Sequence, residues 1–159
     1  MNLYFNKQKI TGDKFENEKT IRKIILKRHM IIDFQNSEFD EYKGNENSKF
    51  IGVENTGVIQ VLRIRGRLFK VFPKVVVNLD IKNGLESLKY RLSFISTIVM
   101  IFLACVLIMG IISYFTSQVF PLDLEVFLGA FVIYSICIYV EFYFTKIELK
   151  THLSFNRES

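Results

Sequence analysis

The fold is decided by one stretch of sequence, SFISTIVMIFLACVLIMGIISYF (residues 93–115), in which no side chain is charged. A helix rises 1.5 Å per residue, so roughly 20 residues cross a hydrocarbon core of about 30 Å. The stretch is therefore long enough to span a bilayer, and we predict a transmembrane helix there. A helix buried in the core of a soluble protein is the alternative interpretation.

A second apolar run follows, EVFLGAFVIYSICIYVEFYF (residues 125–144). It has 15 uncharged residues between Glu125 and Glu141, and three further aromatic residues extend it. We predict a second membrane helix at 124–144. The intervening linker, TSQVFPLDL, is short, so the two helices form an antiparallel hairpin within residues 91–145.

The orientation of this hairpin follows from its flanking charges. Lys89 and Arg91 precede the first helix, Lys146 and Lys150 follow the second, and the linker has no Lys or Arg. The positive-inside rule then places both termini in the cytoplasm and the protein in the inner (plasma) membrane as a multi-pass protein. Residues 146–159 become a short cytoplasmic tail, and the polar start of the chain shows no signal peptide.

One acid, Glu141, lies inside a predicted span. Because carboxylates are costly in the membrane, we expect it to reach the interface or to pair with Arg91 or Lys146. Three hydroxyl side chains of the first helix lie at a similar depth and are candidate hydrogen-bond partners: Ser93, Ser96 and Thr97. A structural role and a part in an ion path both stay open.

Charge is segregated along the chain. Residues 1–92 carry 18 of the 21 Lys and Arg against 11 of the 16 Asp and Glu, so their net charge is +7 in a chain whose total is +5. The basic isoelectric point is therefore a property of the N-terminal part. Phe69 and Phe72 do not interleave with the charges as the stacking platforms of RNA-binding proteins do, so we expect no nucleic-acid partner.

Five short runs rich in Ile, Val and Phe lie between turn signals in residues 1–90, and we predict strands there. These are KTIRKIIL (19–26), HMIIDF (29–34), KFIGVE (49–54), VIQVLRIR (58–65) and LFKVFPKVVVNLDI (68–81). Their spacing indicates an antiparallel sandwich or half-barrel, with the 58–77 hairpin at its centre. An amphipathic basic helix is the alternative for 19–32. GLESLKYRL (84–92) has leucines at helical spacing and predicts a helix that continues into the first span.

The central hairpin carries most of the candidate binding residues. Arg63, Arg65 and Arg67 alternate in sequence, so on a strand they share one face, and Lys70 and Lys74 follow. We expect an exposed basic patch next to the inner leaflet, where anionic headgroups attract each such residue by about 1 kcal/mol. A plain solvated strand face and a protein-binding face are the alternatives.

Residues 29–92 contain a strand ending in the turn Phe72-Pro73-Lys74 and a preceding meander with an acid, Glu54. In these features the stretch resembles the bacterial YcxB-like domains. The resemblance implies a PH-like domain of short antiparallel strands with a closing helix, attached to a pair of membrane helices. The family supplies no established activity to carry over.

Residues for common enzymatic chemistry are missing from the sequence. His29 and His152 lie in different segments, Cys105 and Cys137 lie in the predicted spans, and no phosphate-binding loop or nucleophile elbow occurs. An acidic group lacks the ligand spacing of a calcium loop and is expected to be solvated: Asp33, Glu38, Asp40 and Glu41. We therefore predict no enzymatic activity, no cofactor and no metal.

These observations predict an α+β membrane protein, with a small antiparallel β (PH-like) cytoplasmic domain at 1–90 followed by a transmembrane helical hairpin. The first functional hypothesis is a non-enzymatic binding or regulatory module at the inner leaflet. Its partners would be membrane lipids and a protein partner or a second copy. The alternative is an oligomerising membrane effector, or a channel or transport component gated by the soluble domain.

Overall fold

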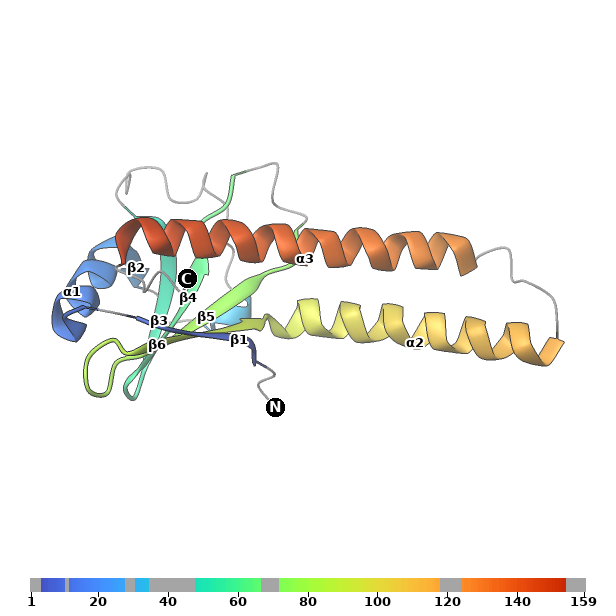
Figure 1. Ribbon diagram of the computed structural model, residues 1–159, viewed down its shortest axis with the longest axis horizontal. Helices are drawn as coiled ribbons and strands as arrows, with labels where there is room; N and C mark the ends of the chain where they lie inside the picture. Colours follow the sequence, from blue (N-terminus) through green and yellow to red (C-terminus); the bar gives the residue numbers. More distant parts are fainter. Residues whose placement is uncertain are drawn as a thin grey trace.

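The computed structural model describes residues 4–10, 12–27, 31–34, 48–66, 72–117 and 124–153. It is an α+β fold in which a six-stranded sheet is followed by two long helices. The helices leave one end of the sheet and run side by side (Figure 1). The α+β prediction is confirmed at this level.

The sheet has the order β1-β6-β5-β4-β3-β2. β2 pairs in parallel with β3, and all other pairs are antiparallel. The central neighbours are therefore β4 and β5, as the predicted 58–77 hairpin requires. The strands are β1 (Tyr4–Lys9), β2 (Ile25–Lys27), β3 (Phe50–Asn55), β4 (Val58–Arg63), β5 (Val75–Asp80) and β6 (Ser87–Leu92).

The N-terminal part differs from the prediction at 19–26. Helix α1 (Lys14–Ile24) occupies most of this stretch, and the side chain of Asp13 caps it by accepting a 2.9 Å hydrogen bond from the Phe15 N–H. Ile21 and Ile24 are buried at helical spacing. The alternative prediction of a helix from residue 19 is therefore confirmed as far as Ile24, after which the chain continues directly into β2.

Two other predicted strands differ from the structure: the described part of 29–34 contains no strand, and 68–81 is a strand only in part. Within 29–34, residues Ile32–Phe34 form the 3₁₀ helix η1, and residues 28–30 lie outside the described part. Within 68–81, β5 begins at Val75, and residues 67–71 also lie outside the described part. Strand β1 was not predicted, because Tyr4–Lys9 is a polar edge strand with only weak alternation.

The prediction of a helix at 84–92 is wrong, because Ser87–Leu92 forms strand β6. Leu88 and Tyr90 point into the core and are fully buried, with Lys89 between them less buried, which is a period of two. The leucines of 84–92 also fit a helical period, so their spacing alone did not distinguish a helix from a strand. Pairing with β5 on one side and β1 on the other satisfies the backbone of β6 as a strand.

The sheet buries apolar side chains on both faces. The larger cluster lies under α1 and the end of the last helix, and includes Phe50, Val77 and Tyr90. The smaller cluster on the other face includes Ile32 of η1, Ile51 and Val76. One sheet with two covered faces therefore replaces the predicted sandwich or half-barrel.

The two long helices are α2 (Phe94–Ser117) and α3 (Leu124–His152). Both are long and apolar enough to cross a membrane, and only 6% of the most apolar window of each is buried. A core helix of a soluble protein would be mostly buried, so the exposed surfaces do not support that alternative. Gly110 lies against Leu124, where an added Cβ would come within 2.4 Å of a leucine methyl group.

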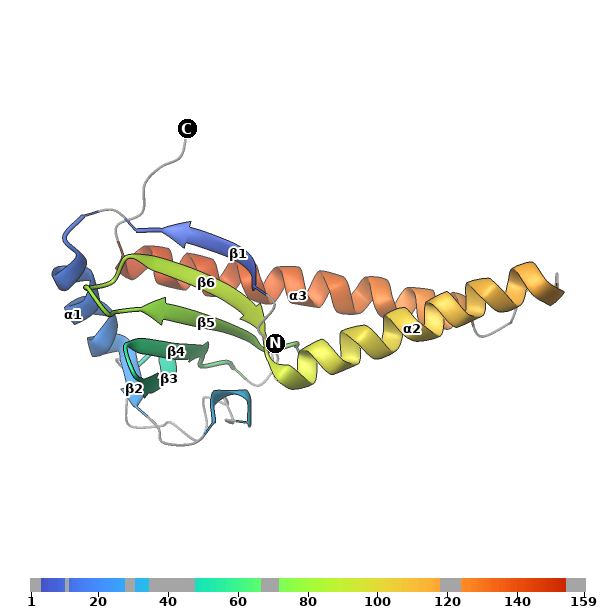
Figure 2. The same ribbon diagram turned by 90° about the horizontal axis from the view of Figure 1, so that it is seen from below.

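Helix α3 continues beyond the predicted end at residue 144. Its last two turns lie over one face of the sheet (Figure 2), where Leu149 and the following Leu153 are buried in the larger core cluster. Residues 146–153 are therefore part of the folded domain rather than a separate tail. The apolar helix and the soluble domain share one continuous element.

Candidate functional site

A buried ion pair links α3 to the last residue of β4, one of the two central strands of the sheet. The Arg63 guanidinium of β4 donates to both Glu141 carboxylate oxygens, with Nη2 to Oε2 at 2.6 Å and Nε to Oε1 at 3.3 Å. The Glu141 side chain is 0% exposed and that of Arg63 is 13% exposed. The Arg63 guanidinium also lies 5.4 Å from the centre of the Phe144 ring. Glu141 is thus neutralised where the apolar part of α3 meets the domain.

The predicted partners of Glu141 were wrong. Arg91 pairs with a different acid, and the Lys146 ammonium lies over the Phe142 ring at 5.9 Å. The residue that does pair, Arg63, follows Ile59 and Val61 at alternate positions of β4. That alternation is the signal that places it on the buried, α3-facing side of the sheet.

Ser96 and Thr97 hold the start of α2 instead of contacting Glu141. The Ser96 hydroxyl oxygen accepts from the Lys74 backbone N–H at 2.8 Å, and the Ser93 hydroxyl donates to Ser96 at 3.0 Å. The Thr97 hydroxyl donates to the Ser93 carbonyl at 2.9 Å. The Tyr134 hydroxyl of α3 donates to the Ser96 carbonyl at 3.1 Å, which joins the two helices at this level.

Asp33 of η1 is a structural residue that the sequence did not reveal. Its carboxylate accepts from Arg91 of β6 at 2.8 and 3.0 Å, and from the Phe94 backbone N–H at 2.9 Å. It therefore neutralises a buried arginine and also satisfies the first N–H of α2. Burial alone would raise the pKa of Asp33, but the hydrogen bonds from Arg91 and Phe94 hold this pKa below its ordinary value. The other members of the predicted acidic group, Glu38, Asp40 and Glu41, lie outside the described residues.

The predicted basic patch does not form an exposed arginine face. Arg65 is only 2% exposed and donates to the Phe72 carbonyl at 2.6 Å, and Arg63 is held by Glu141. The expectation that these two side chains are exposed is wrong, because Glu141 of α3 lies against Arg63 and the Phe72 carbonyl binds Arg65, which lies beyond the end of β4. Lys74 is half-buried, and Arg67 and Lys70 lie outside the described residues.

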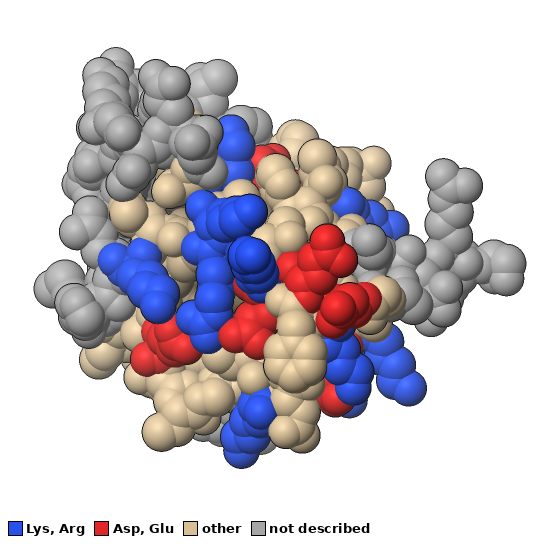
Figure 3. All heavy atoms as spheres, turned by 90° about the vertical axis from the view of Figure 1, so that its left-hand side faces the viewer, with Lys and Arg blue, Asp and Glu red and all other residues tan. Residues whose placement is uncertain are grey.

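The end of the domain opposite the long helices carries mixed charge (Figure 3). Arg22 of α1 contacts Glu18 and makes two hydrogen bonds to Glu54 at 2.8 and 2.9 Å, and Lys27 also contacts Glu54. The hydrogen bonds from Arg22 lower the pKa of Glu54 to about 2. Most of the basic charge here is thus balanced by nearby carboxylates.

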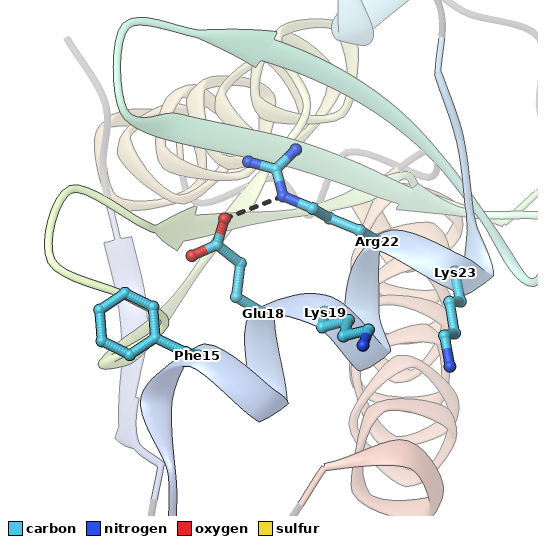
Figure 4. A pocket seen from close by; sticks show the side chains of 5 residues that line it. All are labelled: Phe15, Glu18, Lys19, Arg22 and Lys23. Carbon is cyan, nitrogen blue, oxygen red and sulfur yellow. Dashed lines mark hydrogen bonds and ion pairs between the residues drawn. The ribbon is translucent and has the colours of Figure 1, made fainter.

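An open hollow of about 430 Å³ lies along α1 at this end, shown in Figure 4. Its lining side chains are Phe15, Glu18, Lys19, Arg22 and Lys23. Phe15 is 70% exposed, so the hollow combines an accessible aromatic ring with basic groups. All of these side chains come from one helix, and such a shallow surface suits contact with another macromolecule better than enclosure of a small substrate.

Metal-binding clusters of three or more His, Cys, Asp or Glu do not occur among the residues that the structure describes. Cys105 and Cys137 are free thiols on the apolar helices. No family model, no curated protein and no solved structure matches this chain. The functional argument therefore depends on the geometry alone.

Proposed function

We propose that this chain is a small integral membrane protein that crosses the inner (plasma) membrane twice, with both termini in the cytoplasm. Its folded domain acts as a non-enzymatic binding or regulatory module held at the inner leaflet. The observation that carries this proposal is the way the domain joins the apolar helices. β6 ends at Leu92 and α2 begins at Phe94, while α3 passes onto the sheet without a break.

Such attachments hold a domain in one orientation. The Arg63–Glu141 pair ties α3 to β4, and Asp33 ties the first N–H of α2 to β6 through Arg91. A flexible tether would only confine the domain to the membrane, whereas this junction also sets which surface faces away from it. The α1 end points away from the apolar helices (Figure 1), and a cytoplasmic partner would reach it first.

The resemblance to YcxB-like, PH-like domains is part of the proposal. It is supported by the antiparallel meander β3-β4-β5-β6 and by the helix that lies across one face of the sheet. In this proposal the domain binds a partner and does not transform a substrate. The hollow along α1 is the surface that we assign to a protein partner.

The second candidate function is a membrane effector or channel component whose hairpin oligomerises and is gated by the soluble domain. Its supporting observation is the continuity of α3, because any tilt of the domain would move the apolar helix with it. A pore also needs polar side chains along one helix face, and the spans are almost wholly apolar. We therefore place the binding module first.

Cysteine labelling tests the topology. In a background with Cys105 and Cys137 changed to Ser, one new cysteine is placed at Ser117, at the end of α2, and another at Asn83, an exposed turn of the domain. A membrane-impermeant reagent added outside intact cells should label Ser117→Cys and spare Asn83→Cys. The opposite pattern would overturn the proposed orientation.

Photo-crosslinking separates the two functions. A photoreactive amino acid at Phe15, in the hollow, should give an adduct with a different protein in intact cells. The same group at Phe102, which is exposed near the middle of α2, should crosslink mainly to lipid. Adducts between two copies from Phe102, with none from Phe15, would favour the oligomerising effector.

A further inference from the structure

Five aromatic side chains are exposed around the end of the domain nearest the long helices. We call them the aromatic collar: Tyr4, Phe5, Phe94, Tyr143 and Phe144. Their exposed fractions lie between 38% for Phe144 and 58% for Phe94. Exposed aromatic rings gathered in one region of a soluble domain mark a surface that contacts something else.

The collar residues lie at one level of the molecule although they come from three elements, β1, α2 and α3. Tyr4 of β1 is in register with Arg91, which precedes the start of α2 at Phe94. The Phe5 ring lies 5.4 Å from that of Phe142, which follows Glu141. The collar therefore surrounds the junction where both long helices enter the domain.

A second pair of exposed aromatic rings, Tyr114 and Phe115, lies at the other end of α2. Phe94 and Phe115 are 21 helical steps apart, or about 31 Å at 1.5 Å per residue. The hydrocarbon core of a bilayer is about 30 Å thick, and aromatic residues concentrate at both of its interfaces. The two aromatic levels thus have the separation of the two membrane interfaces.

Basic groups accompany the collar. The Lys89 ammonium lies 6.0 Å from the centre of the Tyr4 ring, and that of Lys146 lies 5.9 Å from the Phe142 ring. The acids at this level, Asp33 and Glu141, are both paired with arginines. Lysines beside aromatic rings suit the headgroup region, where the ring contacts acyl chains and the ammonium reaches phosphate.

We propose that the aromatic collar lies in the headgroup layer of the bilayer, so that the base of the folded domain is itself a lipid-contacting surface. The occupant is the lipid interface because the collar is continuous with the exposed apolar surface of α2 and α3. This inference rests on the proposed function, in which these helices span the membrane. It places the Arg63–Glu141 pair at the depth of the headgroups rather than in the hydrocarbon core.

The chain has no tryptophan, so a single introduced Trp reports on its own surroundings. The full chain is reconstituted in phosphatidylcholine–phosphatidylglycerol vesicles whose acyl chains carry bromine, a fluorescence quencher, either near the headgroup or near the chain end. Tyr143→Trp should show blue-shifted emission that the shallow bromines quench more strongly than the deep ones. Phe5→Trp provides an independent collar position if the first variant folds poorly.

Two matched positions make the outcomes distinguishable. Phe102→Trp, within α2, should be quenched most by the deep bromines, and Phe15→Trp, on α1, should stay unquenched. If Phe102→Trp is quenched while both collar positions behave like Phe15→Trp, the collar inference is overturned and the membrane span stands. If Phe102→Trp is also unquenched, the proposed membrane function fails with it.

Discussion

Arg63 and Glu141 are 78 positions apart in the chain and form a buried ion pair between the end of β4 and the last helix. Each side chain is the counter-charge that the other needs in a site that solvent hardly reaches. Glu141 also marks the end of the uncharged part of α3, and the helix continues from there over the sheet to His152. It is the central contact between the folded domain and the apolar hairpin.

Breaking this pair should destabilise the domain strongly. Glu141→Gln removes the carboxylate that pairs with the mostly buried Arg63 guanidinium, and breaking a buried ion pair in this way typically costs about 3–5 kcal/mol. Urea unfolding of the detergent-solubilised protein, followed by circular dichroism, measures the loss. The double variant Arg63→Met with Glu141→Leu should recover most of the stability, because an apolar pair can replace a buried ion pair. A single variant as stable as the wild type would contradict this role.

Asp33→Asn should weaken the junction on the other face of the sheet. The Asp33 and Arg91 side chains are 14% and 7% exposed, so the uncompensated arginine should cost about 3 kcal/mol of unfolding free energy. The start of α2 should also exchange its amide hydrogens faster, because the Phe94 N–H loses a charged acceptor. Hydrogen exchange read by mass spectrometry checks this, with the middle of α2 as the internal control.

Acid should remove a small part of the stability through Glu54. Its pKa is lowered from 4.5 to about 2 by Arg22 and Lys27, so its contribution is fully present above pH 4.5 and is lost as the pH falls toward 2. The contribution should stay below about 1 kcal/mol, because the Arg22 and Glu54 side chains are 30% and 35% exposed. Glu54→Gln should flatten this part of the stability curve, whereas Glu16→Gln, on the exposed side of α1, should leave it unchanged. Equal curves for the wild type and Glu54→Gln would exclude the proposed linkage.

Gly52 of β3 should not tolerate a side chain. A Cβ there would come within 2.3 Å of the Ile25 Cγ2 and within 3.5 Å of Ile59, both stiff β-branched residues. Gly52→Ala should therefore destabilise the domain by about 1–3 kcal/mol through overpacking. Gly66→Ala is the matched control, since nothing lies within 4 Å of its added Cβ, and it should be neutral or slightly stabilising. Thermal unfolding of both variants decides the comparison.

Much of the architecture could be predicted from local patterns. The absence of charge in residues 93–115 identified α2, because a helix of that composition exposes apolar surface all round. The runs at 49–54 and 58–65 identified β3 and β4, because turn residues separate two β-branched stretches. The wrong secondary-structure predictions have two causes. At 84–92 the apolar residues fit both a helical and a strand period, and at 19–27 one apolar run contains the end of α1 and the whole of β2.

Composition and spacing are local properties of the chain, and they were enough to predict an apolar hairpin after a charged, partly β domain. Which charges pair depends on contacts between residues far apart in the chain. Arg63 ends β4, and its alternation with Ile59 and Val61 indicates which strand face it shares, but no local feature shows that a helix beginning 61 positions later covers that face. Because α3 covers that face, Arg63 pairs with Glu141 and does not contribute to an exposed lipid-binding patch. Long-range packing sets burial, and burial determines whether a charge binds solvent, lipid or another residue of the same chain.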